Sequence, residues 1–357
     1  MTKSKTHRSE LERLAVLEQQ AEVGGGQKAV DRQHERGKLT ARERLNLLFD
    51  PGSFVEVNKL AESQSADFGM QQKKVPGDGV VTGYGNIEGR LVFAYAQDVT
   101  VLGGSVGTIH GQKICRIMDE AIKVKAPLVA LNDSGGGRLH EGFFASRGVA
   151  GMFYRNTAAS GLIPQITGMM GSSAGVAVYS PALTDFIVMV KGKSHMVITG
   201  PGIIKSVTGE DISLEELGGA KVHSEITGTA HFVADSDAEC LELIKKLLSY
   251  LPSNNSENPP VVNTGDYPER IDKKLKEIVP ADFKKSYDMH QVIERVVDQA
   301  TFFEVLRRYA LNIIVGFARM DGHVVGIVAN QPRIKACLLY TSPSPRDLRQ
   351  DLVCRLL

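Results

Sequence analysis

The sequence contains no tryptophan and only four cysteines, Cys115, Cys240, Cys337 and Cys354. No two of them form a C-x-x-C pair, and no two histidines form an H-x-x-x-H pair, so the spacing typical of a structural zinc site is missing. We therefore expect no metal site. Scattered cysteines of this kind are typical of reduced cytosolic thiols, which favours a cytoplasmic protein.

Long apolar runs and an excess of charge are missing as well. No stretch reaches the roughly 18 apolar residues that a membrane span needs, and the polar first 14 residues lack the apolar core of a signal peptide. The 42 Lys and Arg residues nearly balance the 41 Asp and Glu residues. The composition thus predicts a soluble protein and gives no support to a nucleic-acid partner.

Glycine, in contrast, is abundant, with 36 residues. Twice an apolar strand leads into a glycine-rich turn and then a helix: the strand at 127–132 precedes the turn 133–138, and the strand at 163–170 precedes the turn 171–176. Parallel strands need such crossovers, and open α/β sheets bind ligands at the carboxyl ends of their strands. The pattern predicts an α/β fold with these two turns as candidate ligand sites.

The remaining segments predict further helices and two hairpins. Thr40 is a plausible N-cap with Glu43 three residues later, as in a capping box. Hydrophobic periodicity and turn residues give the other expected elements: helices at 8–23, 105–124 and 287–298, and hairpins at 79–98, with its turn at 86–89, and at 312–332, with its tip at 321–322.

A change of composition marks a domain boundary. Residues 252–268 are rich in Pro, Asn and Ser, as linkers are. The strand–turn–strand pattern at 312–332 repeats that of 79–98, which suggests that a second domain of the same type begins there. From about residue 336 this order breaks. We expect a complete first domain at 1–258, the start of a second at 259–335, and an unrelated tail at 336–357.

The first glycine-rich turn, from Asp133 to Arg138, contains three consecutive glycines. Without a Cβ, their backbone can approach a ligand closely, and their N–H groups can point at a developing oxyanion. The alternative is a flexible strand-to-helix turn without any chemical role. The turn alone does not decide between the two.

The second turn, Gly171 to Val176, fits the G-x-S-x-G pattern of a hydrolase nucleophile. In that interpretation Ser173 attacks an ester, and Asp185 with one of three downstream histidines completes a triad. Two alternatives are a second amide-donor turn that does not use the serine, and a turn that only packs its helix on the sheet. The three histidines are His195, His223 and His231.

A basic group precedes these turns. Lys38, Arg42 and Arg44 lie within seven residues of each other and could contact phosphates. The alternative is a solvated face of the helix expected after Thr40. The second interpretation is the simpler one.

Ten motifs occur in an order that is specific to one family. They are GGGQKAVDRQHERGKLTARERLNLLFDPGSFVE, PGDGVVTGYG, GRLVFAYAQD, NDSGGGRLHEG, ASGLIPQI, YSPALTDF, ITGPGIIKSVTGEDIS, EELGGAKVH, GTAHF and NIIVGFARMDGHVVGIVANQP. Over about residues 8–335 the chain closely resembles the carboxyltransferase (β) subunit of propionyl-CoA and related acyl-CoA carboxylases. It also resembles the homologous subunit of biotin-dependent methylmalonyl-CoA decarboxylases.

The resemblance implies a crotonase-like fold of stacked ββα units and a carboxyltransferase activity. A carboxyl group moves between carboxybiotin and the α-carbon of a short-chain acyl-CoA, with propionyl-CoA and methylmalonyl-CoA expected. Backbone N–H groups hold the enolate. Biotin is carried covalently by a partner biotin carboxylase or biotin carrier subunit, and the family forms a dimer of trimers. In decarboxylases the reaction runs in reverse, coupled to a membrane subunit.

The resemblance also assigns residues. The thioester oxyanion hole falls on the backbone N–H groups of Gly136, Gly137, Gly175 and Val176. Acyl-CoA contacts fall within 302–334, and the candidates there are Phe302, Asn312, Gly316, Arg319, Asn330, Gln331 and Pro332.

The chain departs from the family in three places. The family usually has alanine at Gly137 and glycine at Val176. A backbone N–H survives at Val176, so the oxyanion hole could persist. A branched side chain disfavours a positive φ, so we expect strain at Val176, and its effect on activity stays open. The family also continues beyond Pro332 through most of a second domain, so we expect a truncated chain that could be an inactive fragment with an exposed strand edge at 313–330.

Overall fold

The computed structural model describes residues 2–267, 269–282 and 285–334. The chain divides into two compact units, Met1–Asn258 and Pro259–Leu357. The predicted tail at 336–357 lies outside the described residues. That the units are the N- and C-terminal carboxyltransferase domains stays a prediction.

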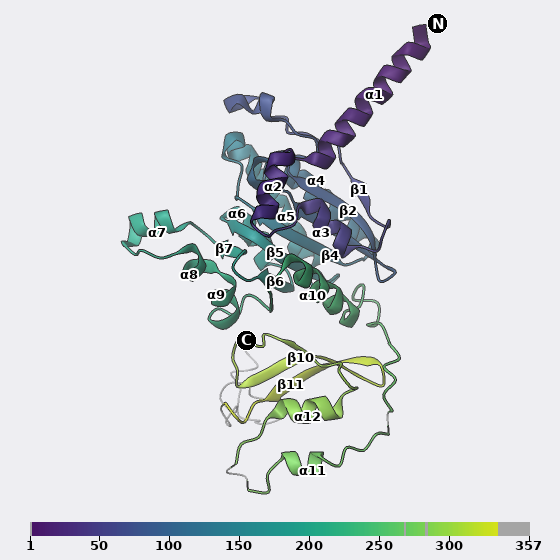
Figure 1. Ribbon diagram of the computed structural model, residues 1–357, viewed down its shortest axis with the longest axis vertical. Coiled ribbons are helices and arrows are strands. Elements are labelled where there is room, and N and C mark those ends of the chain that lie inside the picture. The colour runs from purple at the N-terminus through teal and green to yellow at the C-terminus, as the bar shows by residue number, and fades with distance from the viewer. Residues whose placement is uncertain (1, 268, 283–284, 335–357) are drawn as a thin grey trace. The chain divides into compact units, whose positions relative to one another are not determined.

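The first unit alternates helices and strands (Figure 1). Its α-helices are α1 Thr2–Val23, α2 Gln27–Glu35, α3 Ala41–Leu48, α4 Thr108–Val124, α5 Ala145–Ala159, α6 Val176–Ala182, α7 Pro201–Thr208, α8 Leu214–Gly218, α9 Ala220–Glu225 and α10 Asp237–Tyr250. Its 3-10 helices are η1 Asp67–Lys73, η2 Leu102–Gly104 and η3 Leu139–Phe144. Its strands are β1 Val55–Val57, β2 Val80–Ile87, β3 Arg90–Gln97, β4 Leu128–Ser134, β5 Gln165–Ala174, β6 Phe186–Val190, β7 His195–Val197 and β8 Phe232–Ala234.

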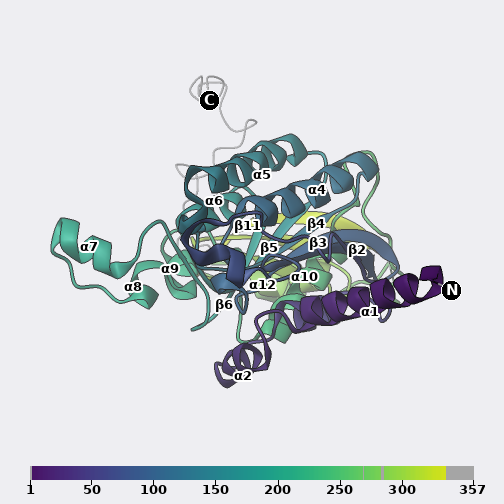
Figure 2. The same cartoon turned by 90° about the horizontal axis from the view of Figure 1, so that it is seen from above.

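One mixed sheet organises this unit. Its strand order is β1-β2-β3-β4-β5-β6-β8, with β7 paired to β5. The first three strands pair antiparallel and the others in parallel. Figure 2 shows α4 and α5 on one side of the sheet, whereas α3 and α10 contact the sheet from the other side. Both faces of β4 are therefore covered, which explains why all seven of its residues are buried.

Several local predictions are confirmed. Thr40 caps α3 and forms a capping box with Glu43, and β2 and β3 form the predicted hairpin. The helix predicted at 105–124 is observed as α4. One of its faces is buried in the core beside α5. Glycine at both 111 and 148 lets the two helices approach closely, since a Cβ on Gly111 would lie only 2.6 Å from the Cα of Gly148.

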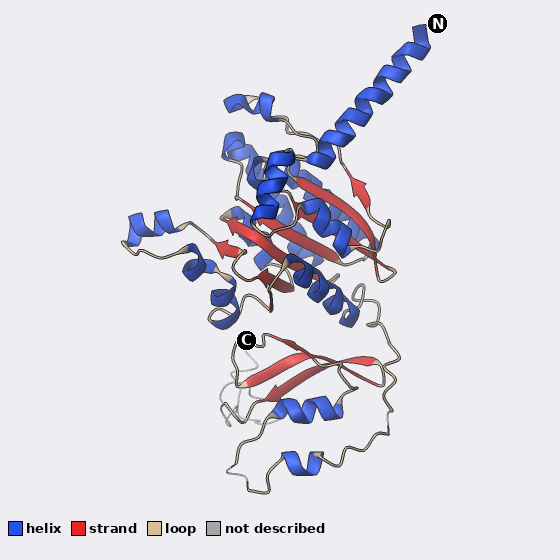
Figure 3. Ribbon diagram, in the orientation of Figure 1, coloured by secondary structure: helices blue, strands red, loops and turns tan. Residues whose placement is uncertain are grey.

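The second unit is built around a small antiparallel sheet, drawn in red in Figure 3. Its helices are α11 Leu275–Ile278 and α12 Met289–Val296, and its strands are β9 Phe303–Val305, β10 Ile313–Met320 and β11 His323–Asn330. The strand order is β11-β10-β9, and the predicted hairpin with its tip at 321–322 is confirmed. Ile293 of α12 packs against Ile314 and Ala318 of β10 to form the core.

Within the described part of the chain, no helix is long and apolar enough to cross a bilayer. No three His, Cys, Asp or Glu side chains there are gathered so that they could hold a metal ion. The thiols of Cys115 and Cys240 are free and buried.

Candidate active site

The two glycine-rich turns lie side by side at the carboxyl ends of β4 and β5. These strands pair in parallel, and the register shifts just before Ser134 pairs with Ser173. The turns approach so closely that a Cβ on Gly136 would lie 2.8 Å from the carbonyl oxygen of Ala174. The structure therefore brings all four predicted oxyanion donors into one place.

The backbone amides of these four residues differ in their partners. The N–H of Gly136 donates to the Ser134 hydroxyl at 3.3 Å, and that of Gly175 donates to a carbonyl of β7 at 3.0 Å. Within the described residues, the N–H groups of Gly137 and Val176 have no acceptor. One amide from each turn is thus free to bind a ligand.

The strain expected at Val176 is not found. Gly175 has φ 57° and ψ −127° and is the N-cap of α6, whereas Val176 is the first helical residue and has no positive φ. The glycine takes the positive φ, so the branched side chain at the next position is tolerated. That expectation was wrong because the turn places the unusual backbone one residue earlier.

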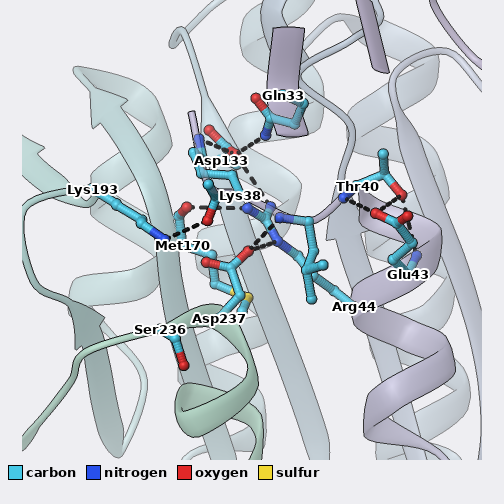
Figure 4. A network of polar contacts seen from close by, with 12 residues as sticks. Gln33, Lys38, Thr40, Glu43, Arg44, Asp133, Met170, Lys193, Ser236 and Asp237 are labelled. Atoms are coloured by element: carbon cyan, nitrogen blue, oxygen red, sulfur yellow. Dashed lines mark hydrogen bonds and ion pairs between the residues drawn. The ribbon is translucent and has the colours of Figure 1, made fainter. Parts of the chain in front are cut away.

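The first turn is held at its start by a buried network around Asp133 (Figure 4). The Asp133 carboxylate lies 2.6 Å from Lys38 Nζ and 3.2 Å from an Arg44 nitrogen, and Gln33 Nε2 donates to it at 3.1 Å. The Arg44 guanidinium also contacts Asp237 at 2.8 Å and a carbonyl of β5 at 3.1 Å. The network ties the segment 33–44 to the strands that carry both turns.

This network corrects the interpretation of the basic group. The Lys38 and Arg44 side chains are 10% and 1% exposed, so they form neither a phosphate-binding patch nor a solvated helix face. Arg42 pairs with Glu56 at 2.7 Å. Burial lowers the pKa of Lys38, although the Asp133 carboxylate opposes this shift. Sequence spacing could not show that these cations have buried carboxylate partners far along the chain.

A second buried network holds the end of the same turn. An Arg138 nitrogen lies 2.6 Å from Asp78 and 2.9 Å from Glu141, and the guanidinium also donates to the Ser105 carbonyl at 2.9 Å. Burial raises the pKa of Asp78, although the positive charge of Arg138 opposes this shift. Ion-paired side chains therefore hold the turn on both sides of its glycines.

His110 continues this network as a neutral side chain. Its Nδ1 lies 3.1 Å from the Asp78 carbonyl, which can only accept, and its Nε2 lies 3.3 Å from Gln97 Nε2. Gln97 Oε1 in turn accepts from Asn132 Nδ2 at 3.1 Å. These contacts suit an imidazole with its proton on Nδ1. Burial, with a further contribution from nearby Arg138, lowers the pKa of His110 to about 3.

A cavity of about 510 Å³ adjoins η3, the segment that follows the first turn. Phe68 and Phe143 line it together with polar residues of α4, and both phenylalanines are largely exposed. Its volume lies within the range of about 300–1,000 Å³ that is usual for small-molecule sites.

The structure does not support the alternative in which Ser173 is a nucleophile. Its hydroxyl is buried and has no hydrogen-bond partner in the structure. Asp185 accepts the first amide of β5, His223 contacts a carbonyl of β7, and His231 accepts an amide of β6. Within the described residues Ser173 therefore has no base in hydrogen-bond reach.

The neighbouring serine, which the sequence motif did not single out, does contact a histidine. Ser172 Oγ lies 2.8 Å from His195 Nδ1, and His195 Nε2 lies 2.9 Å from Glu215 Oε2. The parallel register of β5 and β7 places Ser172 beside His195. Residue spacing does not reveal which strands pair. The contact of Ser172 with His195 could therefore not be predicted from the sequence motif.

In the second unit, Gly316 and Arg319 lie on β10 and make internal contacts. A Cβ on Gly316 would lie 2.5 Å from the Phe303 carbonyl oxygen, so glycine allows β9 and β10 to pair. The Arg319 guanidinium donates to the carbonyls of Pro260 and Gly322, at 2.7 and 2.8 Å. Their predicted acyl-CoA contacts stay predictions.

Asn312, Asn330, Gln331 and Pro332 lie at the open end of the hairpin. The backbone N–H of Gln331 donates to the Asn312 carbonyl at 2.9 Å, and Gln331 Nε2 donates to Asp288 at 2.8 Å. Asn330 ends β11, and Pro332 follows. Phe302 packs against the core of the unit, with its ring centroid 6.3 Å from that of His290.

Comparison with known proteins gives one consistent result. A carboxyl transferase domain profile matches residues 32–350, a range that extends into the predicted tail. The chain is 48% identical over 349 residues to the propionyl-CoA carboxylase carboxyltransferase subunit of Haloferax mediterranei, covering 98% of this chain and 68% of that protein. It is 51% identical over 332 residues to methylmalonyl-CoA decarboxylase subunit alpha of Veillonella parvula, with coverages of 93% and 65%.

A solved structure confirms the predicted crotonase-like fold. The chain matches transcarboxylase 12S, solved with methylmalonyl-CoA and methylmalonic acid bound, with a TM-score of 0.90 and 48% identity, covering 93% of this chain and 65% of that one. The chain thus spans about two thirds of the length of these relatives. The chain belongs to the carboxyl transferase family.

Proposed function

We propose that this chain takes part in biotin-dependent carboxyl transfer to or from the α-carbon of a short-chain acyl-CoA. The observation that carries the proposal is the pair of amides at Gly137 and Val176, which come from two adjacent turns and have no acceptor within the described chain. The names of the relatives give propionyl-CoA or methylmalonyl-CoA as their substrate. Both substrates are acyl thioesters, and an enolate oxygen is what such a pair of amides can hold.

In this mechanism both amides donate to the thioester carbonyl oxygen. The carbonyl is polarised, the α-proton becomes more acidic, and the enolate forms with its negative charge on the held oxygen. Each donor of this kind contributes about 3–4 kcal/mol at best to transition-state stabilisation. Biotin on a partner subunit supplies or accepts the carboxyl group, while the residues of this chain hold the thioester.

Rigidity of the first turn supports the proposal. Fixed dipoles stabilise a transition state most when they need no reorientation during the reaction. The Asp133 network and the Arg138 network hold the two ends of the turn, and the side chains of Asp133, Arg138 and Asp78 are each no more than 2% exposed. The Gly137 amide is therefore held in one orientation before the substrate binds.

The cavity beside η3 is the proposed location of the acyl-CoA chain. It begins two residues beyond Arg138 and has a partly apolar lining that includes Phe68 and Phe143. Apolar pockets with a few polar groups are typical of cofactor and substrate sites.

The direction of transfer and the assembly are further parts of the proposal. A carboxylase adds the carboxyl group and a decarboxylase removes it, yet both use the same enolate, so the site serves either direction. The transcarboxylase 12S relative is described as a hexamer. We propose a dimer of trimers that receives biotin from a biotin carboxylase or carrier subunit in the cytoplasm, or that works with a membrane subunit in the decarboxylase case.

The experiment compares Val176→Pro with Val176→Ala. Proline is tolerated at the first position of a helix, where Val176 lies, and it removes the N–H. Alanine controls for the loss of the valine side chain. In biotin-dependent decarboxylation of methylmalonyl-CoA, Val176→Pro should reduce kcat by about 10²–10³-fold. Val176→Ala, which keeps the N–H, should stay within a few-fold of the starting chain. Equal activity of the two variants would contradict the proposal.

A further inference from the structure

The array Ser172–His195–Glu215 joins three elements of the first unit. Ser172 lies on β5, His195 on β7 and Glu215 on α8. The distances are 2.8 Å from Ser172 Oγ to His195 Nδ1 and 2.9 Å from His195 Nε2 to Glu215 Oε2. A serine, an imidazole and a carboxylate in this order form the arrangement of an activated nucleophile.

The neutral imidazole with its proton on Nε2 satisfies both hydrogen bonds. An ionised carboxylate can only accept, so His195 Nε2 donates to Glu215. In this neutral form Nδ1 carries a lone pair and accepts from the Ser172 hydroxyl. The imidazole therefore presents its basic nitrogen to the serine, as a general base must.

The backbone holds the array in place. The parallel pairing of β5 and β7 sets Ser172 opposite His195, and an isolated bridge joins His195 to Gly219 at the end of α8. A capping box between Ser213 and Glu216 fixes the start of the same helix. The positions of all three side chains thus follow from paired or capped backbone.

Exposure separates this serine from its neighbour. Ser172 is exposed, whereas Ser173 is 1% exposed and its hydroxyl has no partner. The side chain of His195 is 14% exposed and that of Glu215 is 45% exposed. A small acyl ester can therefore reach Ser172 from solvent, but it cannot reach Ser173.

We infer that Ser172 is a nucleophile that hydrolyses short-chain acyl esters and thioesters, with His195 as its base and Glu215 as a positioning residue. Ser172 Oγ attacks the carbonyl carbon as its proton moves to His195 Nδ1. The bond to the alcohol or thiol breaks, and that group leaves with the proton from His195. Water then attacks the acyl-serine, gives one proton to His195, and releases the acid as the proton returns to Ser172.

The first test uses p-nitrophenyl propionate, which needs neither CoA nor biotin, so its outcome is independent of the proposed carboxyl transfer. Ser172→Ala and His195→Gln should each lower the rate of p-nitrophenol release at least tenfold. Ser173→Ala is the matched control and should leave the rate unchanged. Equal rates in Ser172→Ala and the starting chain would overturn the inference.

The second test labels the nucleophile directly. A fluorophosphonate probe followed by peptide mapping should modify Ser172, and His195→Gln should reduce this labelling. Glu215→Gln should lower kcat of ester cleavage without changing KM, because it affects only the orientation of the imidazole. Absence of label on Ser172 in the folded starting chain, as judged by circular dichroism, would overturn the inference even if some ester cleavage were observed.

Discussion

At the scale of single residues, the geometry of the site depends on the glycines at which neighbouring atoms leave no room for a Cβ. Gly135 and Gly136 are adjacent in the same turn but differ in this respect. Gly136 has φ 97°, and a Cβ there would lie 2.8 Å from the Ala174 carbonyl oxygen, whereas at Gly135 the nearest atom would be 3.4 Å away. The requirement for glycine therefore lies at the second of the three positions.

This difference predicts unequal effects of two alanine substitutions. Gly136→Ala should destabilise the chain by about 1–3 kcal/mol. The alanine would be held at a positive φ, and its Cβ would clash with the Ala174 carbonyl oxygen. Gly135→Ala, the matched control, should change the stability by less than about 1 kcal/mol. Urea unfolding followed by circular dichroism measures both. Equal destabilisation would mean that the observed turn geometry is wrong.

The Val176 side chain lies beside the position that a Cβ on Gly137 would occupy. A Cβ on Gly137 would lie 3.3 Å from a Val176 methyl group, so Gly137→Ala should be crowded by the valine. Combining Gly137→Ala with Val176→Gly should relieve that crowding, with a coupling of about 0.5–3 kcal/mol as for residues in contact. A double-mutant cycle in urea tests this, and strictly additive effects would contradict it.

At the scale of elements, two buried networks connect the turn to distant segments. The Asp133 network joins α3 and α10 to β4 and β5, and the Arg138 network joins η3 to the loop before β2. Neither network gave a local signal in the sequence. Buried ion pairs contribute little net stability when intact, yet removing one partner leaves an uncompensated charge.

Loss of Arg44 should therefore be costly. Arg44→Met should destabilise the chain by about 3–5 kcal/mol, because Asp237 loses its ion-pair partner and Asp133 keeps only Lys38. The control is Lys205→Met, which breaks the exposed pair with Asp211 and should cost about 0–1 kcal/mol. Both values come from urea unfolding midpoints, and similar midpoint shifts would count against a buried network.

His110 should make the first unit sensitive to acid. Its pKa is lowered from 6.5 to about 3 in the folded chain, so the unfolded chain binds a proton that the folded chain does not. The stability that its neutral form provides is present above pH 6.5 and is lost as the pH falls toward 3.

The variant His110→Asn, which retains a donor for the Asp78 carbonyl, removes this titration. It should be less stable at pH 7 but should lose less stability between pH 7 and pH 4.5 than the starting chain does. Urea unfolding at the two pH values measures the difference. A pH dependence as steep as that of the starting chain would exclude His110 as its source.

Local sequence signals predicted elements better than they predicted the site. The Thr40 capping box, the hairpin turn at 86–89 and the strands before both turns each depend on nearby residues, and each was found. The motif singled out Ser173, but strand pairing makes Ser172 the serine beside His195. The partners of Lys38 and Arg44 were missed for the same reason, because they come from strands and helices far along the chain.

At the scale of the whole molecule, the fold and the family are established, and the activity is the proposal. The match to transcarboxylase 12S extends over 93% of this chain, which spans about two thirds of its relatives' length. The predicted acyl-CoA contacts lie in the second unit, and the amide pair lies in the first. The central claim is that the amides of Gly137 and Val176 bind the thioester oxygen.

Vibrational spectroscopy of bound propionyl-CoA tests this claim most directly. Isotope-edited infrared difference spectra with a ¹³C-labelled thioester carbonyl report how strongly the carbonyl is polarised, and they need neither biotin nor a partner subunit. We predict a shift of the carbonyl band to lower frequency on binding, a smaller shift in Val176→Pro, and in Val176→Ala the same shift as in the starting chain. Binding without any shift, or the same shift in Val176→Pro, would contradict it.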